Sequence, residues 1–475
     1  MKRALYLLSS LLLVFTTSCV DSLEEYNIDQ KRPNVVPDVT LVTTAQRGLA
    51  RPLVSTNVNL NVFRLYVQYW TETTYTDETN YNIQTRQINK EFWDALYLNS
   101  LGNLNEAKRL IATESTAENV KANQQACIEI LSVYTWKILV DTYGNIPYTE
   151  ALDINKPLPK YDDAKAIYAS LFTRLDAALA ALDPKVAGLG TADIIYGGDI
   201  AKWTKFGNSL KLRMALTVAD DDAARAKTAA EQAAPNVFTS SADNAQFGFL
   251  AVLPNANPLY EDLVNSGRTD FVSASPFVDV LNDLNDPRRG SYFKEADGGG
   301  FKGGVYGDLN DYDEFSAPGE RLEDPTLPGV LLSYSEVEFL LAEARERGFA
   351  VGGTATSHYE AAVTASILES GGTAEEAATY LAQPSVAYST AAGTYKQKIG
   401  VQKWIALYDQ PVIAWTEWRR LDSPALEKPK DALSDIPLRF PYPNSELNQN
   451  GANVSAAIAA MGGDAVTTKI FWDKF

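Results

Sequence analysis

Helical periodicity is the feature of this sequence that most restricts its fold. Between Asn119 and Thr142 one helix face carries Ile128, Leu131, Ile138 and Leu139, and Tyr143-Gly144-Asn145 then supplies a C-terminal cap. A second helix is predicted over 162–182, ended by Asp183-Pro184, with a face formed by Ile167, Leu171, Leu175, Leu179 and Leu182. Alternating patterns typical of strands are few and short. The sequence therefore predicts a mostly α-helical protein.

Two stretches indicate paired helices. The segment 339–348, a glycine-rich turn and the segment 358–368 resemble one tetratricopeptide unit, and the helices at 119–142 and 162–182 could form another. Ser335 with Glu338, and Thr373 with Glu376, have the spacing of a capping box. His358 begins the second helix of its pair, where a capping or solvent-facing side chain is expected. No strict repeat of about 34 residues is present, so the sequence alone leaves a solenoid open.

Charge and residue inventory exclude several classes of function. The chain has 42 Lys plus Arg against 60 Asp plus Glu, a net charge of -18, which repels phosphate backbones and argues against nucleic-acid binding. One histidine and two cysteines exclude multi-His or Cys-rich zinc sites, c-type haem attachment and a disulfide-stapled scaffold. We therefore expect no cofactor. Cys127 lies in an apolar helix and is expected to be an inert core residue.

The N-terminus has the pattern of a secretory signal. A basic start is followed by an apolar run from Ala4 to Phe15, shorter than the roughly 20 residues that span a bilayer. The small residues before Cys19 resemble a bacterial lipobox, in which the cysteine is acylated, although Thr16 stands where leucine is usual; cleavage without lipidation is the alternative. We expect a signal peptide over 1–18, an acylated tether over 19–40 and a single domain over 41–475. The acidic residues Asp21, Glu24 and Glu25 resemble the surface-export signal of Bacteroidetes lipoproteins.

Two long segments lack periodicity and carry the residue types that bind sugars. The segment 71–91 offers Tyr75 and Tyr81 as flat faces and Asn80 and Arg86 as polar edges, with Trp70 at its base. The segment 291–319 offers Tyr292, Tyr306 and Tyr312 among glycines that let backbone approach a ligand closely. These eight residues are the candidate ligand contacts; the alternative for each is packing within its own loop. The acidic run 308–313 misses EF-hand spacing, so we expect a solvated loop, with an irregular calcium site as the alternative.

Several separated motifs carry a family resemblance. They are 141–151 (beginning Asp141-Thr142-Tyr143-Gly144-Asn145), 203–213, 286–288 with 292–293, 338–344, 403–407, 415–420 and 439–448. Together with the lipobox they resemble the SusD/RagB-like outer-membrane nutrient-binding lipoproteins, in the branch described as SusD-like, starch-binding associating with outer membrane. We interpret the motif residues as scaffold, since Trp203, Trp404 and Trp415 suit seams between helices and Arg213, Arg419 and Arg420 can hold carboxylates across them.

The resemblance implies both a fold and a function. The implied fold is all-α, a right-handed superhelix of tetratricopeptide-like helix pairs with long irregular ligand-binding loops. The implied function is that of a non-enzymatic lipoprotein of the bacterial cell surface, anchored in the outer membrane, that binds an oligosaccharide and delivers it to a SusC-like TonB-dependent transporter. Two alternatives stay open: the same architecture with a peptide or other non-sugar cargo, and a surface glycoside hydrolase, which needs only two carboxylates.

Overall fold

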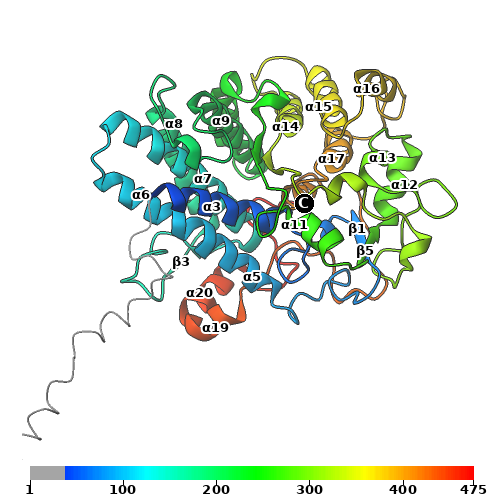
Figure 1. The fold of residues 1–475 in the computed structure, drawn as a ribbon, viewed down its shortest axis with the longest axis horizontal. Helices are drawn as coiled ribbons and strands as arrows, with labels where there is room; N and C mark the ends of the chain where they lie inside the picture. The colour runs from blue at the N-terminus through cyan, green and yellow to red at the C-terminus, as the bar shows by residue number, and fades with distance from the viewer. Residues whose placement is uncertain (1–37) are drawn as a thin grey trace, which may run out of the picture.

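The computed structural model describes residues 38–475, so Cys19, the predicted signal peptide and most of the predicted tether lie outside the described residues. In the described part helices dominate, and the strands pair into three two-stranded sheets (Figure 1). The helices of the frame are α3 (Asp38–Val54), α4 (Phe63–Tyr66), α5 (Ile88–Asp94), α6 (Asn103–Thr113), α7 (Glu118–Tyr143), α8 (Ala164–Ala181), α9 (Ile200–Thr217), α10 (Ala223–Ala233), α12 (Ser275–Asp283), α13 (Arg289–Tyr292), α14 (Tyr334–Glu346), α15 (Ala355–Glu369), α16 (Ala374–Leu381), α17 (Tyr395–Ala406), α18 (Pro411–Leu421), α19 (Asn444–Gln449) and α20 (Gly451–Met461). The helix-rich prediction is confirmed, although α3 includes residues 38–40, which the sequence pattern places in the tether.

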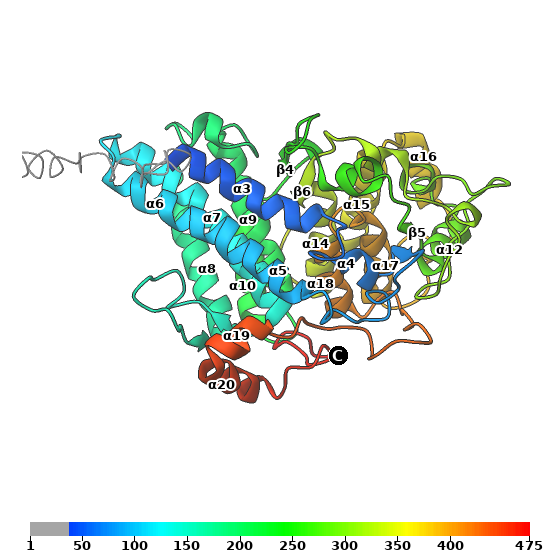
Figure 2. The ribbon, with the colours of Figure 1, turned by 60° about the horizontal axis from the view of Figure 1, so that its bottom comes forward.

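The first predicted helix pair is formed by α7 and α8, whose bounds agree closely with the sequence patterns. α7 ends at Tyr143 because Gly144 has a φ of +82°, and the Gly144 N–H donates to the carbonyl of Val140. α8 begins where the carboxylate of Asp163 accepts a hydrogen bond from the N–H of Ala166 at 2.9 Å. α6, α7, α8 and α9 pack side by side at one end of the molecule (Figure 2).

The second predicted pair is formed by α14 and α15, with a difference in the cap. Ser333, and not the predicted Ser335, caps α14 with its hydroxyl. Ser335 instead donates its hydroxyl to a carbonyl of α15 at 2.8 Å. Nδ1 of His358 lies 2.6 Å from Oε2 of Glu338, so this histidine joins the two helices and is neither a cap nor solvent-facing. The residues predicted for the cap therefore connect the pair.

Two predictions about single residues are confirmed. Thr373 and Glu376 form a capping box at the start of α16. Cys127 is fully buried in α7, and burial raises the pKa of its thiol well above the ordinary value. It is therefore an unreactive core residue.

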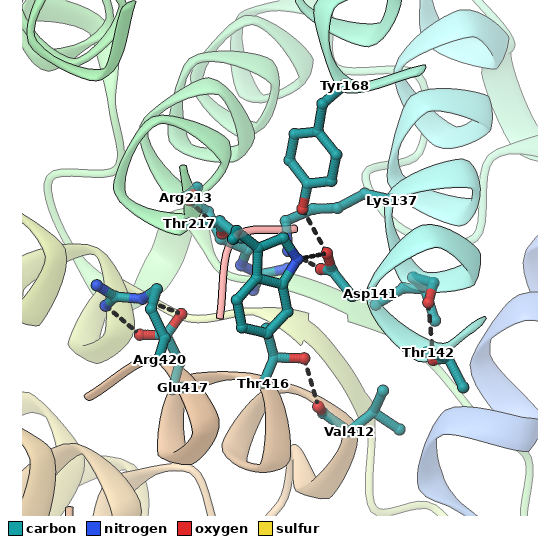
Figure 3. A network of polar contacts seen from close by, with 12 residues as sticks. Lys137, Asp141, Thr142, Tyr168, Arg213, Thr217, Val412, Thr416, Glu417 and Arg420 are labelled. Carbon is teal, nitrogen blue, oxygen red and sulfur yellow. Dashed lines mark hydrogen bonds and ion pairs between the residues drawn. The ribbon is translucent and has the colours of Figure 1, made fainter. Parts of the chain in front are cut away.

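The family-like motifs join helices to one another, as the scaffold interpretation predicts. Figure 3 shows Asp141 of α7 accepting a hydrogen bond from Tyr168 of α8, and Arg420 of α18 paired with Glu417. Arg420 also pairs with Glu343 of α14 at 2.5 Å. The indoles of Trp203, Trp404 and Trp415 are buried, and each donates its N–H to an acceptor from another segment. These residues hold the core rather than a ligand.

A short β ribbon places the loops of interest. β1 (Trp70–Glu72) pairs antiparallel with β5 (Phe271–Ser273), with Glu72 opposite Phe271. The other two sheets pair β2 (Ile146–Pro147) with β3 (Tyr161–Asp162) and β4 (Ala245–Phe247) with β6 (Gly329–Leu332). In Figures 1 and 2, β5 lies toward the end of the molecule opposite α6 and α8. The β1–β5 pairing brings the loop 73–87 beside the segment 261–270. Among residues 38–475, no helix combines the length and apolar character needed to cross a bilayer.

A candidate ligand-binding cleft

A cleft of about 520 Å³ opens where three segments meet. It is lined by residues 56–59, by Glu72, Thr74, Tyr75 and Arg86, and by Asp262, Ser266, Arg268, Asp270 and Phe271. A second hollow of about 300 Å³ adjoins it and shares Asn57, Asn59 and Asp262. The walls of the two hollows carry aromatic, amide, guanidinium and carboxyl groups. That mixture is suited to a ligand with apolar faces and a polar rim.

Tyr75 is the aromatic face of the cleft. Its side chain is 66% exposed, and its backbone has a φ of +56°, a conformation that non-glycine residues rarely adopt. Such conformations gather at binding sites, where the surrounding structure holds them. An exposed ring held on a constrained backbone can stack on a sugar at a small entropic cost.

Arg86 places a guanidinium group on the wall of the cleft and is held there by one of two neighbouring buried carboxyl groups. Its Nε lies 2.5 Å from Oε1 of Glu78, whose side chain is fully buried. Next to Glu78, Oε2 of Glu72 accepts hydrogen bonds from the N–H and the hydroxyl of Thr79 at 3.0 and 2.8 Å. Burial, together with the charge of Glu78, raises the pKa of Glu72 to about 9, so Glu72 is protonated at neutral pH. One proton and one arginine therefore balance two buried carboxyls beneath the cleft.

Asp262 is the other unusual acid of the site. Its Oδ2 is buried and has no hydrogen-bond partner among the described residues. Burial, followed by the charge of Glu261, raises the pKa of Asp262 to about 7. Asn57 and Asn59 are exposed near it in both hollows, where their amides can meet hydroxyl groups.

Of the eight predicted ligand contacts, Tyr75 and Arg86 line the cleft. Trp70 does not: it is fully buried, donates its indole N–H to the hydroxyl of Tyr408 at 2.7 Å and packs against Phe271. Because Phe271 lines the cleft, Trp70 supports the wall from behind. The prediction that Trp70 contacts the ligand is therefore wrong, and this residue has a packing role.

Tyr81 and Asn80 are also buried rather than presented to a ligand. The ring of Tyr81 is 4% exposed and meets the edge of Tyr66, with 5.8 Å between ring centroids. Burial raises the pKa of Tyr81 to about 12. The Asn80 side-chain amide donates to the carbonyl of Gly307 at 2.9 Å, and the Asn80 carbonyl accepts from the N–H of Leu433 at 3.0 Å. Asn80 thus connects three loops.

The tyrosines predicted in the segment 291–319 do not line the cleft. Tyr292 is buried and stacks on Tyr408, with 4.2 Å between ring centroids. Tyr306 is buried and donates its hydroxyl to the carbonyl of Leu65 at 2.7 Å. Both are core residues, which corrects the prediction. Tyr312 is half-buried in the short helical turn Tyr312–Glu314, and its contact with a ligand stays a prediction.

The walls formed by 56–59 and 261–271 are not among the ligand contacts predicted from the sequence. The alternating amides of Asn57-Val58-Asn59 were a usable signal, since exposed amides beside an aromatic loop suit sugar hydroxyls. Asp262 and Arg268 carried no local signal, because only the β1–β5 pairing brings them to the loop 73–87.

The acidic run 308–313 is tied into the loop frame. Asn310 is buried and donates its amide to the backbone carbonyl of Glu72 at 3.2 Å, and Asp308 pairs with Lys430 at 2.9 Å. Within residues 38–475, no group of three or more His, Cys, Asp or Glu side chains is arranged to hold a metal ion.

Comparison with known proteins identifies relatives of the whole fold. The family model described as SusD-like, starch-binding associating with outer membrane, matches residues 30–443. A solved structure of a chitin-binding protein is 27% identical, with 92% of this chain and 100% of that chain covered and a TM-score of 0.79. A chitin-binding SusD homologue from Flavobacterium johnsoniae is 25% identical, with 91% and 98% covered and a TM-score of 0.77.

A SusD homologue from Bacteroides uniformis is 26% identical, with 92% and 99% covered and a TM-score of 0.78. A search of curated proteins finds no match. The solved structures confirm the predicted all-α fold of tetratricopeptide-like helix pairs.

Proposed function

Because the chain belongs to the SusD-like family described as starch-binding associating with outer membrane, we propose that it binds an oligosaccharide at the cell surface and delivers it to a SusC-like TonB-dependent transporter. SusD-like proteins are binding proteins, and this chain is accordingly a binding protein and not an enzyme. Acylation at Cys19 is the proposed anchor to the outer membrane, with the domain facing the cell exterior. The family name supports association with that membrane.

The observation that carries the proposal is the meeting of Tyr75 and Arg86 in one open cleft. Tyr75 presents a ring to solvent, and Arg86 lies on the same cleft with a guanidinium that uses Nε for Glu78. A sugar ring needs a flat apolar partner for its C–H face and planar donors for its hydroxyl groups. The exposed amides of Asn57 and Asn59 add donors and acceptors to the same walls.

Chitin oligosaccharides are the first ligands to test, because two of the similar structures are named as chitin-binding. The purified protein is titrated calorimetrically with N-acetylated chitooligosaccharides, maltoheptaose and xylohexaose, and the mixtures are then analysed for shortened products. We expect binding to at least one of these glycans without cleavage. Products released at catalytic rates would restore the hydrolase alternative. Absence of binding to every glycan, together with binding of a peptide, would favour the non-sugar cargo.

Delivery requires a complex in the membrane, which is a separate measurement. The protein carries an affinity tag at its C-terminus, and outer membranes solubilised in mild detergent are passed over a resin that binds this tag. We expect a TonB-dependent transporter to co-purify in a stoichiometric amount. A protein that is recovered alone from such membranes would contradict delivery while leaving glycan binding unaffected.

A further inference from the structure

The charged groups of the cleft are matched in pairs. Each arginine on its walls, or on those of the adjoining hollow, has a carboxylate partner: Arg51 with Glu261 at 2.6 Å, Arg86 with Glu78 at 2.5 Å, and Arg268 with Asp270 at 2.5 Å. Within the described part of the chain, each cation of the cleft therefore already has a counter-charge, although the terminal N–H groups of Arg86 can still donate hydrogen bonds to an uncharged ligand. Sulfate and carboxylate groups are usually bound by free guanidinium or ammonium groups.

Asp262 lies outside these pairs. It contributes to the walls of both hollows, and its Oδ2 is buried without a hydrogen-bond partner among the described residues. The groups that face it are the carboxylates of Glu261 and Asp270, the guanidinium of Arg51 and the backbone N–H of Thr56. Burial and Glu261 raise the pKa of Asp262 to about 7, so it exchanges its proton near neutral pH.

A ligand that covers Asp262 removes its remaining water. Removal of water from a carboxyl group disfavours the charged form, and Arg51 is already engaged by Glu261. A neutral carboxyl keeps one O–H donor and can give it to an uncharged hydroxyl or amide oxygen of a sugar. An acidic glycan would instead bring a second negative charge to a site that has no unpaired cation.

We propose that Asp262 is the residue through which the cleft selects uncharged glycans: protonated, it donates a hydrogen bond to a hydroxyl or acetamido oxygen of the ligand, and it excludes glycans that carry carboxylate or sulfate groups. The inference rests on the proposed function and specifies the ligand class of the same site. It makes Asp262 a specificity-determining residue, and it predicts that a neutral glycan takes up a proton when it binds above neutral pH.

The test is a calorimetric titration at pH 5.5, 7.0 and 8.5 with N-acetylated chitotetraose, maltoheptaose and xylohexaose as neutral probes and oligogalacturonate as the acidic probe. We expect the affinity for the neutral glycan that binds to fall by about three- to tenfold from pH 5.5 to 8.5, since one unit of pKa difference corresponds to about tenfold. Asp262→Asn should bind it with an affinity that is nearly independent of pH, because Glu72, the other cleft carboxyl with a raised pKa, stays largely protonated up to pH 8.5. Oligogalacturonate should bind at least about tenfold more weakly at pH 7.0 than the neutral glycan.

His358→Gln is the matched control, because it removes the only histidine of the chain, and that residue does not line the cleft. The affinity of this variant for the neutral glycan should fall with rising pH as steeply as that of the wild-type protein. A pH-independent affinity of the wild-type protein, the same slope in Asp262→Asn, or oligogalacturonate binding as tight as that of the neutral glycan would overturn the proposal. The pH dependence of the wild-type affinity tests the proposal even if the Asp262→Asn variant is unstable. Silence toward every probe at every pH would instead contradict the proposed function, and this inference with it.

Discussion

Nε of Arg86 lies 2.5 Å from Oε1 of Glu78, and this pair fixes a guanidinium on the wall of an open cleft. Glu78 is fully buried, whereas the side chain of Arg86 is 31% exposed. Among the described residues, no hydrogen bond occupies the two terminal nitrogens of Arg86, so they are available to a ligand. One arginine thus neutralises a buried charge and presents donors to the cleft.

The first prediction concerns the two roles of Arg86. Arg86→Gln should lower the free energy of unfolding by more than about 1 kcal/mol, because Glu78 loses its counter-charge in a buried position. The double variant Arg86→Gln with Glu78→Gln should recover most of that stability but not the affinity for glycan. Urea denaturation and calorimetric titration measure the two effects. Equal stability of the single variant and the wild type would contradict the pairing.

The second prediction separates Tyr75 from Tyr81. Tyr75→Ala should weaken glycan binding by more than about 1 kcal/mol and leave the melting temperature nearly unchanged, because this ring is exposed. Tyr81→Ala should lower the free energy of unfolding by about 3 kcal/mol or more, because that ring is buried. Tyr75→Phe is the control that keeps the ring. Unchanged affinity of Tyr75→Ala would remove this residue from the site.

The third prediction concerns Trp203 as scaffold. Trp203→Ala should lower the free energy of unfolding by about 3–5 kcal/mol, because a buried indole is deleted. Trp203→Phe keeps most of the ring and removes the 2.7 Å hydrogen bond to Asp193, so it should cost less. Denaturant unfolding followed by circular dichroism gives both values. A loss of less than about 1 kcal/mol in the alanine variant would be inconsistent with its burial.

The fourth prediction follows from Glu72. The folded protein holds the proton of Glu72 up to about pH 9, whereas the unfolded chain releases it near the ordinary value of 4.5. The folded state therefore binds more protons between these values, and this residue's contribution to stability falls as the pH rises through that window.

Glu72→Gln resembles the protonated acid and should unfold less readily than the wild type at pH 8.5, by more than about 1 kcal/mol, with little difference at pH 4.5. Thermal unfolding at several pH values measures this. A stability gap that does not change with pH would show that Glu72 ionises normally.

The fifth prediction concerns the proposed anchor. Cys19→Ser should release the protein from the outer membrane, because acyl chains cannot be attached to serine by the lipoprotein pathway and the described helices provide no membrane span. Fractionation of cells and metabolic labelling with a fatty acid measure attachment and acylation. Undiminished surface attachment of the serine variant would contradict lipidation at this residue.

The sequence predicted the helices well because their signals are local. The periodicity of 119–142 and 162–182, Gly144 and the Thr373–Glu376 box depend on neighbours within a few residues, and all appear in the structure. The cap of α14 was misplaced because Ser333 and Ser335 are both acceptable caps, and only the packing of α15 engages Ser335 elsewhere.

The candidate site was predicted only in part, because burial of a loop is decided by distant segments. Tyr75 and Arg86, which the residue types of an aperiodic loop predict as ligand contacts, do line the cleft. Trp70 and Tyr292 looked equally suitable, but both are covered by Tyr408, a contact that no local pattern reveals. Asp262 was not predicted because no local pattern marks it as part of a site. Only the pairing of β1 with β5 places it beside a loop nearly 200 positions earlier in the chain.

The bonds of Asn80 have an evolutionary consequence. They tie the loop 73–87 to Gly307 and Leu433, and at Gly307 a side chain would collide with Pro429. Exchange of the loop 73–87 alone with that of a relative would break this junction. A change of ligand specificity by recombination must therefore transfer three distant stretches of the gene together. Point substitutions at exposed positions such as Tyr75 can instead alter ligand preference one step at a time.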